Sequence, residues 1–211
     1  MIYLIGVSHN VQAIARDART SGHDEFEQLL RKAITDTKST FIAEEYSEEA
    51  LAEINAVSIA KTVADELQID HAFCDAGRGQ RAAMGYREFG DLQQSVNDDI
   101  DLTWSITEPA ELKKITLAIQ MGVYQPRREK FWFEHLPNHA RRDGIFICGD
   151  AHVDTFGALL TDKGVMSKAL HRAVGMADWE KDEQEKILQH LAENPELRNW
   201  IPPELRNTST A

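Results

Sequence analysis

Residues 2–9 read IYLIGVSH, and residues 144–152 read GIFICGDAH. Each stretch opens with a short, unbroken apolar run, which is typical of a strand buried on both faces of a parallel sheet. Two other runs, TFIA and HAFC, have the same character. Together they predict strands over residues 2–7, 40–43, 71–74 and 144–148.

Helical patterns separate the first three of these strands. Residues 24–37 and 47–67 both repeat apolar side chains at helical spacing. A strand–helix–strand–helix–strand order requires parallel crossovers, so the predicted fold is α/β, an open and mainly parallel sheet with flanking helices. Residues from about 84 to 142 are rich in helix formers and contain no convincing strand, which predicts a large helical insertion before the last strand. Within it, Pro126 predicts a boundary between two helices.

The length and composition fit one folded domain. A chain of 211 residues, 42% of them hydrophobic, is long and apolar enough to bury a proper core. We therefore expect a single α/β domain over residues 1–206, with the insertion at about 84–142. Residues 207–211 are expected to form a flexible tail.

The net charge and the cysteine content limit the kinds of protein that this chain can be. Lys and Arg number 23 against 35 Asp and Glu, a net charge of −12, which argues against binding to nucleic acid or to an anionic membrane surface. No apolar run is long enough to span a bilayer, and the N-terminal stretch lacks the features of a signal peptide. Cys74 and Cys148 each lie inside an apolar run and are expected to be buried thiols. These features predict a cytoplasmic protein.

The first and last predicted strands end in the same way. Gly6-Val7-Ser8-His9 follows one, and Gly149-Asp150-Ala151-His152 follows the other. The carboxyl ends of parallel strands share one edge of the sheet, where ligands bind. The repeated Gly-x-x-His pattern therefore predicts that His9 and His152 lie together at this edge.

The other two strands also deliver charged residues to the same edge. Glu44 and Glu45 follow the second strand, and because neighbouring side chains on a strand point to opposite faces, only one is expected to face the histidines. Either Glu44 or Glu45 can be the carboxylate that faces the histidines, and the slight preference is for Glu44. Asp75 follows the third strand, and Arg78 and Arg81 lie just beyond it, where a forked contact can bind a substrate carboxylate or phosphate.

These motifs resemble those of a known superfamily. It contains the erythromycin esterases, the TraB/PrgY and Tiki proteins, and the ChaN-like haem-binding lipoproteins. Its members combine two Gly-x-x-His-like motifs with a strand-end Glu and an Arg on an inserted helix. Here GVSH and GDAH match the two histidine motifs, Glu44 or Glu45 matches the acid, and Arg128 in Arg127-Arg128-Glu129 matches the arginine. The likeness covers roughly residues 1–157.

The resemblance implies a hydrolase of peptide or ester bonds acting on a small molecule or a peptide. In one version His9, His152 and a strand-end Glu bind one divalent Mn, Co or Zn ion. Asp150 departs from the family pattern and adds a further carboxylate. The expected metal ligands are then His9, Glu44, Asp150 and His152. In the other version, without a metal, one histidine acts as general base and the other holds the intermediate. Arg128 stabilises the oxyanion or anchors a substrate anion.

Two other classes of function stay open at this point. One is a non-catalytic protein of the same fold that binds a small ligand or, less favoured, haem, for which no Cys-x-x-Cys-His motif is present. The other is a partner-binding domain that uses the aromatic residues of the helical insertion. The sequence also leaves open a homo-oligomer.

Overall fold

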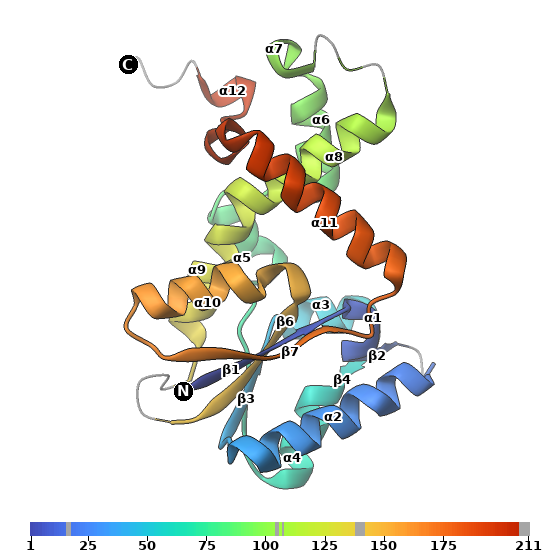
Figure 1. Ribbon diagram of the computed structural model, residues 1–211, viewed down its shortest axis with the longest axis vertical. Helices are drawn as coiled ribbons and strands as arrows, with labels where there is room; N and C mark the ends of the chain where they lie inside the picture. Colours follow the sequence, from blue (N-terminus) through green and yellow to red (C-terminus); the bar gives the residue numbers. More distant parts are fainter. Residues whose placement is uncertain (16–17, 104–105, 107, 138–141, 207–211) are drawn as a thin grey trace. The chain divides into compact units, whose positions relative to one another are not determined.

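The computed structural model describes residues 1–15, 18–103, 106, 108–137 and 142–206 (Figure 1). The chain divides into two compact units. The first contains Met1–Gln80 and Arg128–Ala177, and the second contains Arg81–Arg127 and Asp178–Ala211. The tail predicted at 207–211 lies outside the described residues.

The first unit is built on a parallel sheet of five strands in the order β5-β3-β6-β1-β7. This confirms the predicted α/β fold. The strands are β1 (Ile2–Val7), β3 (Phe41–Glu44), β5 (Asp70–Phe73), β6 (Gly144–Gly149) and β7 (Ser167–Val174). A separate antiparallel pair joins β2 (Ala13–Ala15) to β4 (Ala56–Ser58).

Strand β7 follows β6 and forms one edge of the sheet, beside β1. No sequence pattern predicts this strand. Its segment, SKALHRAV, is only partly buried along its whole length and lacks the continuous apolar run of a central strand. Its pairing with β1 is also interrupted by register shifts, and Ala173 has a positive φ of 53°. An exposed edge strand of this kind leaves little hydrophobic signal in the sequence.

Helices cover both faces of the sheet (Figure 1). On one face α2 (Ser21–Thr37) and α4 (Ile59–Leu67) bury Phe26 and Val63 against β1, β3 and β6. On the other face α10 (Val153–Asp162) and the part of α9 (Gln125–His135) that follows Arg127 bury Phe156 and Trp132. The short helices of this unit are α1 (His9–Gln12), α3 (Glu48–Glu53) and a 3-10 turn, Asp150–His152, while α5 (Arg78–Ala83) crosses into the second unit.

The helix predicted over residues 47–67 is two helices with a strand between them. Asn55 adopts a left-handed backbone with φ of 49°, which ends α3 and turns the chain into β4. Ser58 then caps α4 by accepting a hydrogen bond from the amide of Lys61. The long prediction was wrong because its apolar periodicity continues across the break.

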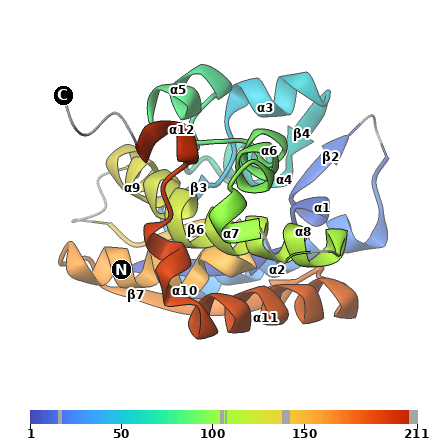
Figure 2. The ribbon, with the colours of Figure 1, turned by 90° about the horizontal axis from the view of Figure 1, so that it is seen from above.

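The second unit is helical throughout its described part. It contains α6 (Phe89–Asn97), α7 (Ile100–Thr103), α8 (Pro109–Ile119), α11 (Asp178–Glu193), a 3-10 helix (Pro195–Asn199) and α12 (Pro203–Arg206). Figure 2 shows α8 between α6 and α11, and both contact it. Leu92, Ile119, Tyr124 and Leu191 are central to its own hydrophobic core.

Pro126 does not separate two helices. Helix α8 continues through a π-helical turn, Gln120–Tyr124, directly into α9. Proline lacks the N–H that an α-helical bond to the carbonyl four residues earlier requires. The wider π turn just before Pro126 changes the bonding pattern there, so the helix passes the proline without a break.

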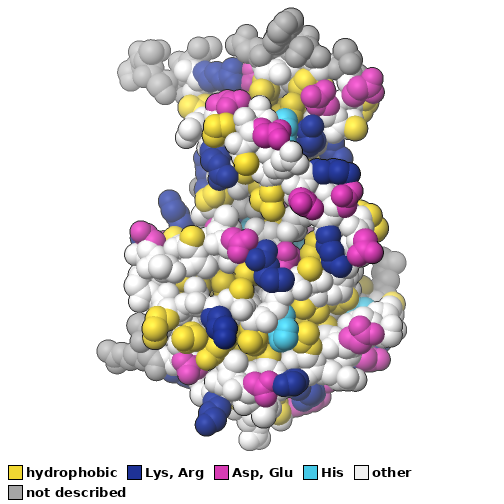
Figure 3. All heavy atoms as spheres, viewed as in Figure 1, with side chains coloured by type: hydrophobic (Ala, Val, Ile, Leu, Met, Phe, Trp, Pro, Cys, Tyr) yellow, Lys and Arg dark blue, Asp and Glu magenta, His cyan; other side chains and the backbone are white. Residues whose placement is uncertain are grey.

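The cysteines, the helices and the surface charges can also be compared with the sequence predictions. Both cysteines are free and buried, as predicted. Among the described residues, no helix combines the length and the apolar character needed to cross a bilayer. On the face shown in Figure 3, acidic and basic side chains are interspersed.

Candidate functional site

Three strands of the first unit end at the same level of the sheet. Val7 of β1 pairs with Gly149 of β6, so the two Gly-x-x-His motifs leave the sheet side by side. The amide of Glu45, just past β3, donates a hydrogen bond to the Ile147 carbonyl of β6. The strand register thus brings His9, Glu45 and the turn that carries His152 to one edge.

The Glu45 carboxylate lies at the centre of this group, with a side chain only 1% exposed. Its Oε1 atom lies 2.9 Å from Nη2 of Arg128, 3.6 Å from Nε2 of His152 and 3.9 Å from Nε2 of His9. Its Oε2 atom accepts a hydrogen bond of 2.8 Å from the amide of Gly149. One carboxylate oxygen therefore faces both histidines and the arginine, and we call these four residues, with Asp75 and Glu129, the rim cluster.

The surroundings of Glu45 keep it ionised. Burial by itself acts to raise the pKa of this carboxyl group. Attraction to His152, Arg128 and His9 acts in the opposite direction, together with the backbone hydrogen bond, and the balance lowers the pKa to about 2. Glu45 is consequently an anion across the physiological range.

The lowered pKa of Glu45 predicts a loss of stability in acid. The folded-state pKa of about 2 lies below the ordinary 4.5, so the contribution is complete above about pH 4.5 and disappears as the pH falls toward 2. The difference corresponds to about 3 kcal/mol in the free energy of unfolding. Urea unfolding at pH 7 and at pH 2.5 measures how much free energy of unfolding is lost in acid. This loss should be smaller in Glu45→Gln than in the wild type. Equal losses would contradict the prediction, and Glu25→Gln, an exposed control, should behave as the wild type.

His152 is held by a second carboxylate. Its Nδ1 atom lies 2.8 Å from Oε1 of Glu129, which also accepts a hydrogen bond from the Thr155 hydroxyl. The ring packs edge-on against Trp132 at 4.7 Å and is only 4% exposed. Because a carboxylate accepts at Nδ1, the proton of the neutral ring lies there, and Nε2 presents its lone pair toward Glu45.

Arg128 is fixed by α9 and by the loop after β5. Its Nε and Nη2 atoms donate to Asp75 at 3.2 and 2.6 Å, a two-point contact that sets the plane of the guanidinium. Trp132, one helical turn later, donates from Nε1 to the same carboxylate at 2.9 Å. Asp75 is thus bound by two residues on one face of α9, and Arg128 reaches from it to Glu45.

His9 is the accessible member of the rim cluster. It begins α1, and its side chain is 52% exposed. Gly149 lies directly beneath it, since a Cβ atom at that position would lie 3.1 Å from Nε2 of His9 and 3.5 Å from Oε2 of Glu45. The absence of a side chain at Gly149 therefore leaves the space in which the two groups meet.

The structure does not place Glu44 in the rim cluster. Its fully buried carboxylate accepts hydrogen bonds from Gln12, Ser58 and His71 on the other side of β3. Adjacent strand residues alternate in direction, so Glu45 faces the histidines and Glu44 cannot. The sequence preference for Glu44 over Glu45 is thus corrected.

Of the other predicted site residues, Asp75 belongs to the rim cluster, and Asp150, Arg78 and Arg81 have surroundings of their own. Asp150 pairs with Arg172 at 2.9 Å and accepts the amide of Ala173, so it holds β7. Arg78 begins α5 and is exposed. Arg81 belongs to the second unit, where it lies 3.4 Å from Glu88. Asp150 and Arg78 do not join the rim cluster, and Asp75 acts there on Arg128.

The residues predicted to bind a metal do not fit one. Glu44 and Asp150 have other partners, whereas His9 and His152 both face one oxygen of Glu45. The remaining carboxylate, Glu45, already binds Arg128 through the oxygen that a shared ion would need. No group of three or more His, Cys, Asp or Glu within the described ranges is arranged to hold a metal ion.

Sequence reasoning missed Glu129 and Trp132 as parts of the site. Glu129 was noted only as the neighbour of Arg128, yet its side chain is 4% exposed and fixes His152. Trp132 is a core residue that also donates a hydrogen bond to Asp75. A signal was present, because Arg128 and Trp132 are four residues apart and so share a helix face.

Comparisons of this chain with protein-family models, with curated proteins and with solved structures give no match. The resemblance to the superfamily of erythromycin esterases and TraB/PrgY proteins therefore stands on its motifs alone.

Proposed function

We propose that the rim cluster hydrolyses ester or peptide bonds, with His152 as the general base that activates water. The observation that carries the proposal is the position of the His152 ring between two buried carboxylates, Glu129 at Nδ1 and Glu45 near Nε2. A base held in this way has one fixed tautomer and a lone pair directed at the reacting group.

The chemistry follows from the two ring nitrogens of His152. A water molecule that donates one hydrogen bond to Nε2 has Glu45 Oε1 as an acceptor for its second hydrogen. As the water attacks the carbonyl carbon, its proton passes to Nε2, and Glu129 stabilises the positive charge that the ring gains. The same proton then passes from Nε2 to the leaving oxygen or nitrogen when the bond to it breaks.

His9 and Arg128 have separate roles in this scheme. His9 is half exposed and faces the same Glu45 oxygen, so it can donate a hydrogen bond to the oxyanion that forms on the carbonyl. Arg128 neutralises part of the charge of Glu45 and is a positioning residue, since its guanidinium pairs with the carboxylates of Glu45 and Asp75. The motif resemblance to erythromycin esterases and Tiki proteins supports the same reaction class.

A test of the proposal combines a substrate panel with a one-methyl change at the site. The purified full chain is assayed with p-nitrophenyl esters of increasing acyl length and with peptide p-nitroanilides. Gly149→Ala should lower kcat/KM for the substrates that are hydrolysed by about threefold to tenfold, because the new methyl group crowds His9 and shifts its ring by a few tenths of an ångström. Gly149 has φ of −54°, so alanine is compatible with its backbone.

The matched control is Gly90→Ala, where an added methyl group meets no atom within 4 Å. It should leave kcat/KM unchanged. A panel with no hydrolysed substrate, or equal activity of wild type and Gly149→Ala, would contradict the proposal.

A further inference from the structure

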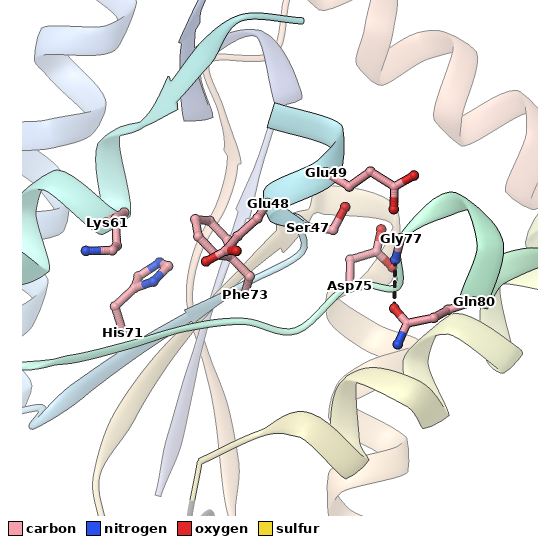
Figure 4. A pocket seen from close by; sticks show the side chains of 9 residues that line it. All are labelled: Ser47, Glu48, Glu49, Lys61, His71, Phe73, Asp75, Gly77 and Gln80. Carbon is pink, nitrogen blue, oxygen red and sulfur yellow. Dashed lines mark hydrogen bonds between the residues drawn. The ribbon is translucent and has the colours of Figure 1, made fainter. Parts of the chain in front are cut away.

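A second polar region of the first unit lies away from the histidines of the rim cluster. It is an open cavity of about 400 Å³ between the start of α3, strand β5 and the loop before α5 (Figure 4). The residues that matter for its chemistry are Glu48, Glu49, Lys61, His71, Phe73 and Asp75. We call this cavity the β5 pocket.

The charges of the β5 pocket are predominantly negative. Glu48 and Glu49 are exposed and form no ion pair with any described residue. Lys61 directs its ammonium group to both oxygens of Asp65 at 2.5 Å, so its charge is already compensated. Asp75 is likewise compensated, by Arg128. Two carboxylates are left to attract a cation.

His71 provides an independent indication of a ligand. Its side chain is only 5% exposed, and Nε2 lies 2.8 Å from the buried Glu44 carboxylate. Since Glu44 accepts at Nε2, Nδ1 of the neutral ring is a hydrogen-bond acceptor, and it has no partner among the described residues. Figure 4 shows the ring on the wall of the pocket beside Phe73, which it meets edge-on at 4.6 Å.

The chemistry of the pocket selects one class of ligand. Two carboxylates and an imidazole lone pair all accept hydrogen bonds, so the ligand must donate them and carry positive charge. The face of Phe73 adds an apolar surface that also attracts cations. A metal ion fits poorly, because no group of three or more His, Cys, Asp or Glu in the described part of the chain is placed to hold one.

We propose that the β5 pocket binds a small organic cation that carries primary ammonium groups on an apolar chain. One ammonium group binds the carboxylate of Glu48 and the other binds that of Glu49, because Figure 4 shows these two side chains directed to different sides of the start of α3. The ligand donates a further hydrogen bond to Nδ1 of His71. The methylene groups lie against Phe73. The pocket shares Asp75 with the rim cluster, but the proposed binding does not depend on the proposed hydrolysis, and its test measures binding alone.

The experiment is isothermal titration of the full chain at pH 8.0 with butane-1,4-diamine, and with butane-1,4-diol as the uncharged analogue. We expect the diamine to bind a saturable site with a Kd below about 1 mM. This Kd corresponds to a binding free energy of about −4 kcal/mol. The diol should not bind. The double variant Glu48→Gln/Glu49→Gln should weaken diamine binding by at least tenfold.

The control for the net charge of −12 is a second double variant, Glu25→Gln/Glu185→Gln, which removes two exposed carboxylates far from the pocket residues in sequence. It should bind the diamine as the wild type does. Equal weakening in both double variants would show diffuse attraction and overturn the proposal. Absence of saturable binding, or equal binding of the diol, would overturn it as well. His71→Phe should also weaken binding, since it removes the acceptor but keeps a ring.

Discussion

Replacing His152 with alanine should lower kcat for ester or peptide hydrolysis by about 10²- to 10⁴-fold, the usual contribution of a general base. The side chain is nearly enclosed, and it is the histidine of the rim cluster with a carboxylate at each ring nitrogen. Glu129→Gln should cause a smaller loss, of about tenfold to a hundredfold, because the amide no longer stabilises the protonated ring. Steady-state kinetics on the most active substrate of the panel measures both.

The matched control for this prediction is His171→Ala. His171 lies on the edge strand β7 and belongs to no part of the rim cluster. Its variant should keep the wild-type kcat. A His152→Ala protein that is folded and fully active would contradict the assignment of the base, and an equal loss in His171→Ala would show that the effect is not local.

Replacing Arg128 with leucine should reduce the free energy of unfolding by about 3–5 kcal/mol, the cost of leaving a buried charge without its partner. Arg128 contacts both Glu45 and Asp75, whose side chains are 1% and 6% exposed. Leucine fills much of the volume but leaves two buried carboxylates facing each other. Urea unfolding at pH 7 measures the difference.

Two further variants separate the charge effect from packing. Arg78→Leu removes an exposed arginine from the same unit and should change the stability by less than about 0.5 kcal/mol. Adding Asp75→Asn to Arg128→Leu should recover part of the loss, because one of the two unpaired charges disappears. A change below 1 kcal/mol in Arg128→Leu would contradict the account of the cluster.

The sheet was predictable because its central strands carry their own signal. β1 and β6 are continuous apolar runs with almost every residue buried, and the two strands end at paired positions of the register, Val7 and Gly149. Strand β7 was not predictable, because an edge strand that is half exposed lacks a continuous apolar run. The break at Asn55 was also hidden, because a single left-handed residue interrupts a pattern that remains periodic on both sides.

For the site, the sequence predicted both histidines and Arg128 but not which carboxylate serves them. Glu44 and Glu45 are chemically identical, and only the exit direction of β3 decides which one meets His9 and His152. Glu129 reaches His152 across 23 positions of sequence. Such a contact depends on how α9 packs on the sheet, which local patterns do not specify.

The most direct test of the central claim is rescue of His152→Ala by free imidazole. If His152 is the general base, imidazole in the reaction should restore part of the lost hydrolysis in a saturable manner. The wild type and Glu129→Gln, which retain the ring, should not respond. A folded His152→Ala protein whose activity is lost and does not respond to imidazole at any concentration would contradict the claim that this side chain accepts the proton of the attacking water.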